Sequence, residues 1–235
     1  MAKPNLNFEL NFWEKYSFIA GTDEAGRGAL AGPIVVAAVI LPSYFQSVFI
    51  QDSKVLKPTQ RNKAYKIIKK SALEYKIVVK SPREVEEKNP LQATKEAMIE
   101  AALKLKNRPN LCLVDGQEEI KIPNILSHSI IGGDRKSISI AAASVVAKVT
   151  RDAIMKKLHK KYPHYDWENN KGYPNPIHLQ AIFKYGISPL HRKTYEPIKS
   201  LVSGKVSREA LCQKYNCKVD KISCNGLEKT KNKIN

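Results

Sequence analysis

The feature that most constrains the fold is a glycine-rich turn between two apolar segments. Residues 16–22, "YSFIAGT", have the composition of a strand, and residues 33–41, "PIVVAAVIL", form a Val- and Ile-rich run typical of a strand buried on both faces. Between them stand two adjacent carboxylates and the turn "GRG". A strand, a glycine turn and a second strand predict a hairpin-like unit that carries carboxylates beside its turn.

The glycine turn has two possible uses as a binding site. Gly26, Gly28 and Gly32 have the spacing GxGxxxG, with Asp52 about 20 residues further on, which superficially matches a dinucleotide-binding fingerprint. That fingerprint needs a helix whose N-terminus meets the pyrophosphate, whereas the residues after Gly32 predict a strand. We therefore expect no dinucleotide site. The turn can instead press backbone N–H groups against a ligand, with Arg27 as a charged donor for phosphate, or it is simply a tight turn with a solvated arginine.

The rest of the chain alternates between helical and extended patterns. Further strands are expected over residues 74–81, 110–115 and 125–131, and helices over residues 60–73 (started by Pro58), over residues 90–106, and after Asp134. Ala141–Ala143 are small residues that let the last of these helices lie close to a sheet. The pattern predicts an α/β fold with helices on the faces of a sheet.

The charge of the chain indicates the class of partner. Among its 235 residues, 40 Lys and Arg stand against 22 Asp and Glu, giving a formal net charge of +18. A chain this basic attracts polyanions, unless the excess is only a compositional bias. No apolar run approaches the roughly 20 residues that span a bilayer, and no signal-peptide core is present, so a cytoplasmic protein without a membrane partner is expected. The cysteine spacings do not predict zinc.

Carboxylates follow or end several of the predicted strands. Asp23 and Glu24 follow the first, Asp115 ends another, and Asp134 follows a third apolar segment. If the first strand and the Asp115 strand are neighbours, their carboxyl ends bring Asp23 and Asp115 together. Clustered carboxylates need a cation among them, and oxygen ligands favour Mg²⁺ or Mn²⁺, two of which could clamp a phosphodiester. Taken singly, Asp134 could be a helix N-cap and Asp115 part of a turn.

Several segments together resemble the motifs of the prokaryotic type 2 ribonucleases H, the ribonuclease HII family. They run in the family's order from about Phe18 to Pro197: "GTDEAGRGALAGP", "DSKVL", "LVDG", "GGDRKSISIAAASVVAKVTRD", "NKGYPNPIHL" and "GISPLHRKTY". The resemblance implies a ribonuclease H-like α/β fold, a mixed five-stranded sheet flanked by helices, with a small helical C-terminal region. The motifs cover a catalytic domain (17–198) and leave outside them an N-terminal arm (1–16) and a basic C-terminal extension (199–235), whose own sequence predicts that it is partly helical or disordered.

The same resemblance implies an activity. Family members cleave the RNA strand of RNA/DNA hybrids and nick 5′ to single ribonucleotides embedded in duplex DNA, leaving 3′-hydroxyl and 5′-phosphate ends. Those nucleic acids are the expected partners of a monomeric enzyme, and two Mn²⁺ or Mg²⁺ ions are the expected cofactors of the active complex. The family's metal-binding carboxylates correspond to Asp23, Glu24, Asp115 and Asp134. Its glycine-arginine-glycine clamp corresponds to Gly26, Arg27 and Gly28. Its junction-sensing tyrosine corresponds to Tyr173, and a phosphate contact corresponds to Lys54. Asp152 also stands in a family motif but is placed outside the metal site.

These implied roles are chemically reasonable, and two other interpretations remain to be weighed. An enzyme that distinguishes RNA from DNA must read the 2′-hydroxyl, which a glycine turn can approach, and the Tyr173 ring can stack on the adjacent deoxyribose. The related ribonucleases HIII have a different glycine turn and a long extra N-terminal domain. Here the turn is Gly26-Arg27-Gly28 and the arm before it is short, which favours ribonuclease HII. A binding protein without catalysis is disfavoured because unneutralised carboxylates would repel nucleic acid. His178 and His191 are expected to make structural hydrogen bonds.

Overall fold

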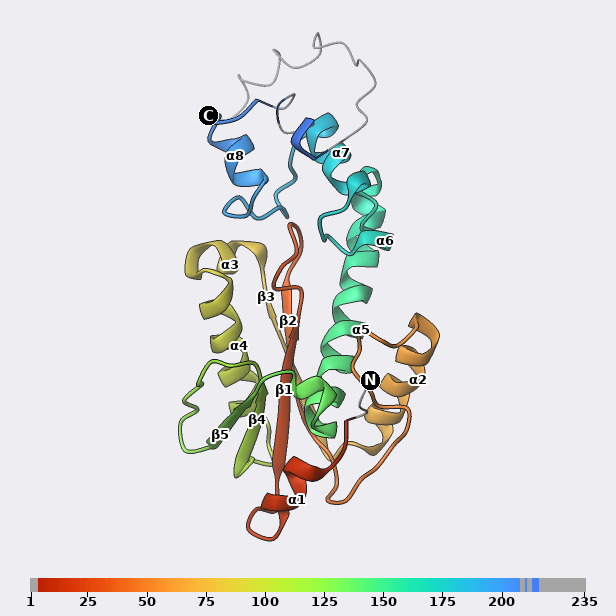
Figure 1. Ribbon diagram of the computed structural model, residues 1–235, viewed down its shortest axis with the longest axis vertical. Helices are drawn as coiled ribbons and strands as arrows, with labels where there is room; N and C mark the ends of the chain where they lie inside the picture. The colour runs from red at the N-terminus through yellow and green to blue at the C-terminus, as the bar shows by residue number, and fades with distance from the viewer. Residues whose placement is uncertain (1–3, 208–209, 211–212, 216–235) are drawn as a thin grey trace.

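A mixed five-stranded sheet forms the centre of the computed structural model, which describes residues 4–207, 210 and 213–215. The strand order is β3-β2-β1-β4-β5 (Figure 1). The strands are Ile19–Ala25 (β1), Ile34–Ile40 (β2), Glu74–Lys80 (β3), Leu111–Asp115 (β4) and Leu126–Ile130 (β5). β1, β2 and β3 pair antiparallel, whereas β4 runs parallel to both β1 and β5. The predicted sheet is confirmed, and β1 and β4 are neighbours.

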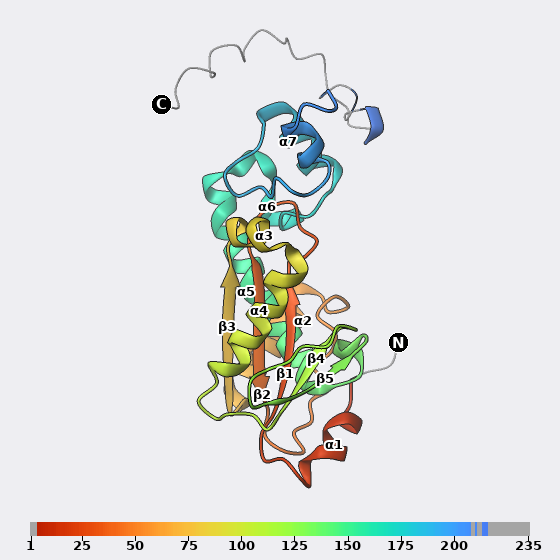
Figure 2. The same ribbon diagram turned by 90° about the vertical axis from the view of Figure 1, so that its left-hand side faces the viewer.

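Helices cover both faces of the sheet, as Figures 1 and 2 show. On one face, α5 (Ile138–Lys161) crosses β1 and β2, with α2 (Pro58–Ser71) beside it. On the other face, α4 (Pro90–Leu103) packs on β2 and β3, preceded by α3 (Pro82–Lys88). The expected helices are present, and α3 is an addition to them. The sequence pattern missed α3 because it has only seven residues.

Short helices follow the end of α5 and gather beyond the glycine turn (Figure 1). They are α6 (Trp167–Asn170), α7 (Pro176–Tyr185) and α8 (Ile198–Val202), preceded by the 3₁₀ turn η2 (Pro163–Tyr165). Trp167 is fully buried among them, and its Nε1–H donates a hydrogen bond to Nε2 of His178 at 3.0 Å. The same Nε2 of His178 lies 3.1 Å from Nε2 of His191. Burial lowers the pKa of His178 to about 4 and that of His191 to about 3. Both histidines therefore make the structural contacts expected of them.

Two shorter elements complete the architecture. Helix α1 (Asn7–Trp13) packs on the sheet near the beginning of α5, and the 3₁₀ turn η1 (Gly133–Arg135) connects β5 to α5. Within the described part of the chain, no helix is long and apolar enough to cross a membrane.

The first strand ends later than the sequence predicted. Asp23 and Glu24 were expected to follow the strand, but they lie inside β1, where Asp23 pairs with Ala37 and Glu24 with Val36 of β2. The antiparallel ladder with the apolar β2 holds both acidic residues in extended conformation, although carboxylates are uncommon within strands. The carboxylates are thus positioned by a central strand of the sheet and not by a loop.

Gly21 sets the distance between α5 and β1. A Cβ at this position would lie 2.1 Å from the carbonyl carbon of Ser139 and 2.4 Å from the backbone nitrogen of Ile140. These are backbone atoms at the beginning of α5, so a side chain on β1 would have to displace the helix. The close approach also fixes the segment just before α5, which carries Asp134.

We predict that Gly21→Ala destabilises the fold by about 1–3 kcal/mol, the usual cost of overpacking a well-packed core. Gly28→Ala is the matched control, because a Cβ at Gly28 would meet no atom within 4 Å. Denaturant unfolding of the two variants and the parent chain measures the difference. Equal midpoints for Gly21→Ala and Gly28→Ala would contradict the close approach of α5.

Candidate active site

Parallel pairing of β1 and β4 brings three aspartates together. Asp23 lies in β1, Asp115 ends β4, and Asp134 lies in η1, which two residues separate from the end of β5. One carboxylate oxygen from each residue lies within 4.8 Å of the other two. Asp23 and Asp134 are each only 3% exposed. The proximity of Asp23 and Asp115 that we expected from strand adjacency is therefore present, and Asp134 joins them.

Backbone N–H groups orient two of these carboxylates. The N–H of Glu24 donates to Oδ1 of Asp23 at 2.7 Å, and the N–H of Gly133 donates to Oδ1 of Asp115 at 2.7 Å. Asp134 is not the N-cap of α5, which was the alternative interpretation. Ser137 has that position, and its hydroxyl accepts from the N–H of Ile140 at 3.2 Å. The Asp134 side chain is therefore available at the cluster.

Glu24 lies beside the three aspartates but outside their closest grouping. Its Oε1 is 3.5 Å from Nη1 of Arg27, an ion pair between residues three apart in the sequence. Glu24 and Asp23 nevertheless line the same cleft, which has a volume of about 480 Å³. The structure thus places Glu24 at the site without adding its carboxylate to the cluster.

The cluster carries more negative charge than it can hold without a cation. Burial, together with the charges of Glu24 and Asp115, raises the pKa of Asp23 well above its usual value. Burial and the charge of Asp134 likewise raise the pKa of Asp115. Three oxygen donors of this kind, with no sulfur or imidazole among them, fit a hard divalent cation such as Mg²⁺ or Mn²⁺.

Lys54 provides the positive charge that already contacts the cluster. Its Nζ lies 3.0 Å from Oδ2 of Asp134. Although burial disfavours the charged ammonium, the hydrogen bond and the charge of Asp134 outweigh it and raise the pKa of Lys54. Lys54 therefore neutralises part of the charge of the cluster at Asp134.

The glycine turn lines the same cleft as the carboxylates. Gly26 has a φ of +97°, and a Cβ there would lie 1.9 Å from Nε of Arg151, so the fold itself requires this glycine. Gly28 differs, because a Cβ there would meet nothing within 4 Å. The open space at Gly28 lies on the cleft, where it lets a ligand approach the backbone.

Buried arginines hold the backbone of this turn. Arg192 donates through Nη1 to the carbonyl oxygen of Arg27 and through Nη2 to that of Gly32, both at 2.8 Å. The hydroxyl of Tyr195 donates to the same Arg27 oxygen at 2.7 Å. Arg151 donates to two further carbonyls of the segment, and burial lowers its pKa to about 10. Within the described residues neither buried arginine pairs with a carboxylate, so the turn itself is their partner.

Tyr173 is bound to the same turn. The carbonyl oxygen of the preceding Gly172 accepts from the N–H groups of Leu30 at 2.8 Å and Ala31 at 3.2 Å. The guanidinium carbon of Arg151 lies 5.2 Å from the centre of the Tyr173 ring.

Eight of the nine residues that the sequence singled out line the 480 Å³ cleft: Asp23, Glu24, Gly26, Arg27, Gly28, Lys54, Asp115 and Tyr173. Asp134, the ninth, adjoins it through Lys54.

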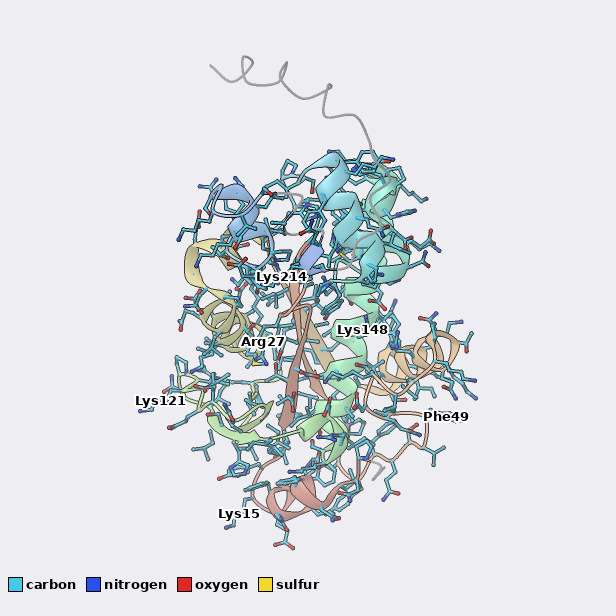
Figure 3. All side chains as sticks on the ribbon, turned by 45° about the horizontal axis from the view of Figure 1, so that its top comes forward. Lys15, Arg27, Phe49, Lys121, Lys148 and Lys214 are labelled. Carbon is cyan, nitrogen blue, oxygen red and sulfur yellow. The ribbon has the colours of Figure 1, made fainter. Side chains whose placement is uncertain are left out.

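Sequence reasoning missed Lys148, which lines the same cleft from α5. Figure 3 shows Lys148 and Arg27 on either side of the central strands. Nζ of Lys148 donates to Oδ1 of Asp152 at 2.6 Å, and Oδ2 of Asp152 is 3.4 Å from Nη1 of Arg61. Asp152 thus pairs with two cations and is not one of the three clustered aspartates. Lys148 comes four residues after Ser144, which also lines the cleft, and this helical spacing was the available signal.

Comparison with known proteins identifies the family. The sequence model described as ribonuclease HII matches residues 20–197. A ribonuclease HII from Mycoplasma mycoides subsp. mycoides SC is 44% identical over 210 residues, which are 89% of this chain and 99% of the relative. The chain belongs to the ribonuclease HII family. It is accordingly a metal-dependent ribonuclease H, an enzyme that acts on RNA/DNA hybrids.

Solved structures of ribonucleases H from archaea share the fold. The ribonuclease H2 from Pyrococcus horikoshii OT3 superposes with a TM-score of 0.68 at 27% identity, over 80% of this chain and 98% of that one. The ribonuclease HII in the PCNA complex from Archaeoglobus fulgidus superposes with a TM-score of 0.66 at 26% identity, over 76% of this chain and 95% of that one. The ribonuclease H-like fold implied by the sequence motifs is therefore confirmed.

We predict that Asp23→Asn stabilises the metal-free protein. Asparagine keeps an oxygen that accepts from the N–H of Glu24 but removes a buried charge from the cluster. For a chain of this size a gain of about 1 kcal/mol corresponds to a Tm rise of about 2–4 °C. Calorimetry in EDTA at neutral pH measures it.

The pH dependence of this gain has a definite sign. The raised pKa of Asp23 means that the folded protein releases this proton at higher pH than the unfolded chain does. Below the unfolded-state pKa of about 4 both states become protonated and the charge costs nothing, whereas the cost grows as the pH rises above that value and is complete once the pH exceeds the folded-state pKa. The Tm difference between Asp23→Asn and the parent should vanish near pH 4 and be largest at neutral pH. A variant less stable than the parent at pH 7 would contradict this account.

Proposed function

We propose that the chain cleaves the RNA strand of RNA/DNA hybrids and also nicks duplex DNA on the 5′ side of a single embedded ribonucleotide. The products are a 3′-hydroxyl and a 5′-phosphate. The observation that carries the proposal is that one cleft contains both halves of such a site. The carboxylates of β1 and β4, the glycine turn and Tyr173 all line this cleft.

The proposed cofactors are two Mn²⁺ or Mg²⁺ ions held by Asp23, Glu24, Asp115 and Asp134. The oxygen-only donor set, the 4.8 Å spacing of the aspartates and the raised pKa values of Asp23 and Asp115 support this assignment. When bound, divalent ions in such a site activate water and neutralise charge that develops on the scissile phosphate.

The other residues of the cleft would bind and select the substrate. The open backbone at Gly28 can approach a 2′-hydroxyl, which is both a donor and an acceptor, and so distinguish ribose from deoxyribose. Arg27 and Lys54 are the proposed phosphate contacts. We assign to Tyr173 the stacking contact with the next sugar, where a second hydroxyl would be disfavoured. That contact would direct cleavage to an RNA–DNA junction.

The domain division follows the same proposal. Residues 17–198 would form the catalytic domain, between the N-terminal arm (1–16) and the basic extension (199–235), most of which lies outside the described residues. The monomeric state and the cytoplasmic location expected from the sequence stay predictions.

The activity is tested with a labelled DNA duplex that contains one ribonucleotide, incubated with the protein and Mg²⁺ or Mn²⁺. We expect a nick 5′ to the ribonucleotide that is absent in EDTA, in an all-DNA duplex and with Asp115→Asn. If neither metal supports a nick while salt-sensitive duplex binding persists, the chain is a binding protein on this fold and the proposal fails.

Tyr173 provides a second test in the same assay. We predict that Tyr173→Ala loses about tenfold or more in cleavage at the single ribonucleotide relative to a long RNA/DNA hybrid, because an aromatic stacking contact contributes about 1–3 kcal/mol. Tyr185→Ala, which removes an exposed tyrosine from α7, is the matched control. An unchanged ratio between the two substrates would show that Tyr173 does not sense the junction.

A further inference from the structure

The N-terminal arm contacts the segment that carries Asp134. In Figure 1 helix α1 and the residues before it lie near the beginning of α5. The N–H of Asn5 donates to the carbonyl of Lys136 at 3.2 Å, and the N–H of Ile138 donates to the carbonyl of Asn5 at 3.1 Å. These two bonds form a parallel bridge between Asn5 and Ser137. The arm thus pairs with the backbone that connects η1 to α5.

Glu9 strengthens this contact from inside the protein. It is 0% exposed, although it belongs to a seven-residue helix near the chain terminus. Its Oε1 accepts from the hydroxyl of Ser137 at 2.6 Å and from the N–H of Ser139 at 3.0 Å. Oε2 has no hydrogen-bond partner among the described residues. A buried carboxylate with an unsatisfied oxygen is costly, so its position needs a reason.

The position of Glu9 relative to α5 supplies part of that reason. Glu9 lies at the N-terminus of a 24-residue helix, where the free N–H groups and the helix dipole favour a negative charge. Its other partner, Ser137, is the N-cap of the same helix. Glu9 therefore fixes the first turn of α5 from a separate element of the chain.

The same turn is linked to the carboxylate cluster through Gly133. The N–H of Ser137 donates to the carbonyl of Gly133 at 2.8 Å, and the N–H of Gly133 donates to Oδ1 of Asp115 at 2.7 Å. Asp134 lies between these two bonded positions. The segment that carries Asp134 is thus held by Asp115 at one end and by Glu9 at the other.

Apolar contacts keep the arm in this position. Phe8, Phe12 and Trp13 pack against the cluster of Ile19, Leu111, Leu113, Ile130 and Ile140, to which β1, β4, β5 and α5 contribute. The side chain of Leu6 is also buried. Burial of this apolar surface can anchor the arm, so that Glu9 does not have to hold it alone.

We propose that Glu9 is a positioning residue for the metal site, because it holds the first turn of α5 and thereby the carboxylate of Asp134. The inference rests on the proposed role of Asp134 as a metal ligand. Glu9 and Asn5 lie outside residues 20–197, the part of the chain that the ribonuclease HII family model matches. Groups that orient metal ligands without touching the metal commonly affect metal affinity.

The test is Mn²⁺ binding to the full chain, measured without nucleic acid from the electron paramagnetic resonance signal of free Mn²⁺. We expect Glu9→Ala to weaken Mn²⁺ affinity by about fivefold or more. Glu9→Gln keeps an oxygen acceptor for Ser137 and Ser139 and should stay within about twofold of the parent. Glu14→Ala is the matched control, because it removes the same charge from an exposed position on the same arm.

The outcomes separate this inference from the proposed function. If the parent chain binds Mn²⁺ and Asp134→Asn weakens binding but Glu9→Ala and Glu14→Ala bind equally, the inference is overturned whatever their Tm values are. A loss in Glu9→Gln as large as that in Glu9→Ala would also overturn it, since hydrogen bonding would not be the cause. If Asp134→Asn binds Mn²⁺ as the parent does, the proposed metal site itself fails.

Discussion

Mutual repulsion among buried carboxylates is the constraint around which this fold is organised. Asp23, Asp115 and Asp134 hold their oxygens within 4.8 Å of one another, and two of the three are almost inaccessible to water. Such a cluster opposes folding when all three carboxylates are ionised, and the ion pair of Lys54 offsets this at Asp134. Each aspartate is therefore fixed by an element that is stable for other reasons: a central strand, the end of its parallel neighbour, and a turn tied to the longest helix.

Two buried arginines hold the glycine turn that lines the cleft. Arg151 and Arg192 are fully buried, and their guanidinium groups bind carbonyl oxygens of the glycine turn. A flexible glycine segment thereby becomes a fixed surface at which backbone groups can face a ligand. Because the turn joins β1 to β2, the strand that carries Asp23 also leads directly into it. One strand thus carries an aspartate of the cluster and continues into the glycine turn.

The sequence predicted those parts of the molecule that depend on local pattern. The apolar runs around the glycine turn predicted two strands, and the strand that ends on Asp115 predicted where that carboxylate would lie. The end of β1 was misplaced because pairing with β2 extends the strand through Asp23 and Glu24, and long-range pairing leaves no local signal. The alternative that Asp134 is the N-cap of α5 was wrong, because Ser137, three residues later, has that position.

Buried charged residues were the main features that the sequence could not reveal. Arg151, Arg192 and Glu9 are of types that almost never become fully buried unless they are paired, so residue type does not mark them as interior. Their partners are backbone carbonyls, a serine hydroxyl and a helix N-terminus, which come together only in the folded chain. Lys148 was missed although it comes four residues after Ser144, because its place on the cleft depends on how α5 crosses the sheet.

The central claim is that the aspartate cluster is a divalent metal site. Crystals grown with Mn²⁺ and measured at a wavelength where manganese scatters anomalously test it most directly. The account predicts an anomalous peak within about 2.0–2.6 Å of oxygens from Asp23 and Asp115, with Lys54 moved away from Asp134 or sharing it. A cluster without a peak at saturating Mn²⁺, with Lys54 still bound to Asp134, would contradict it.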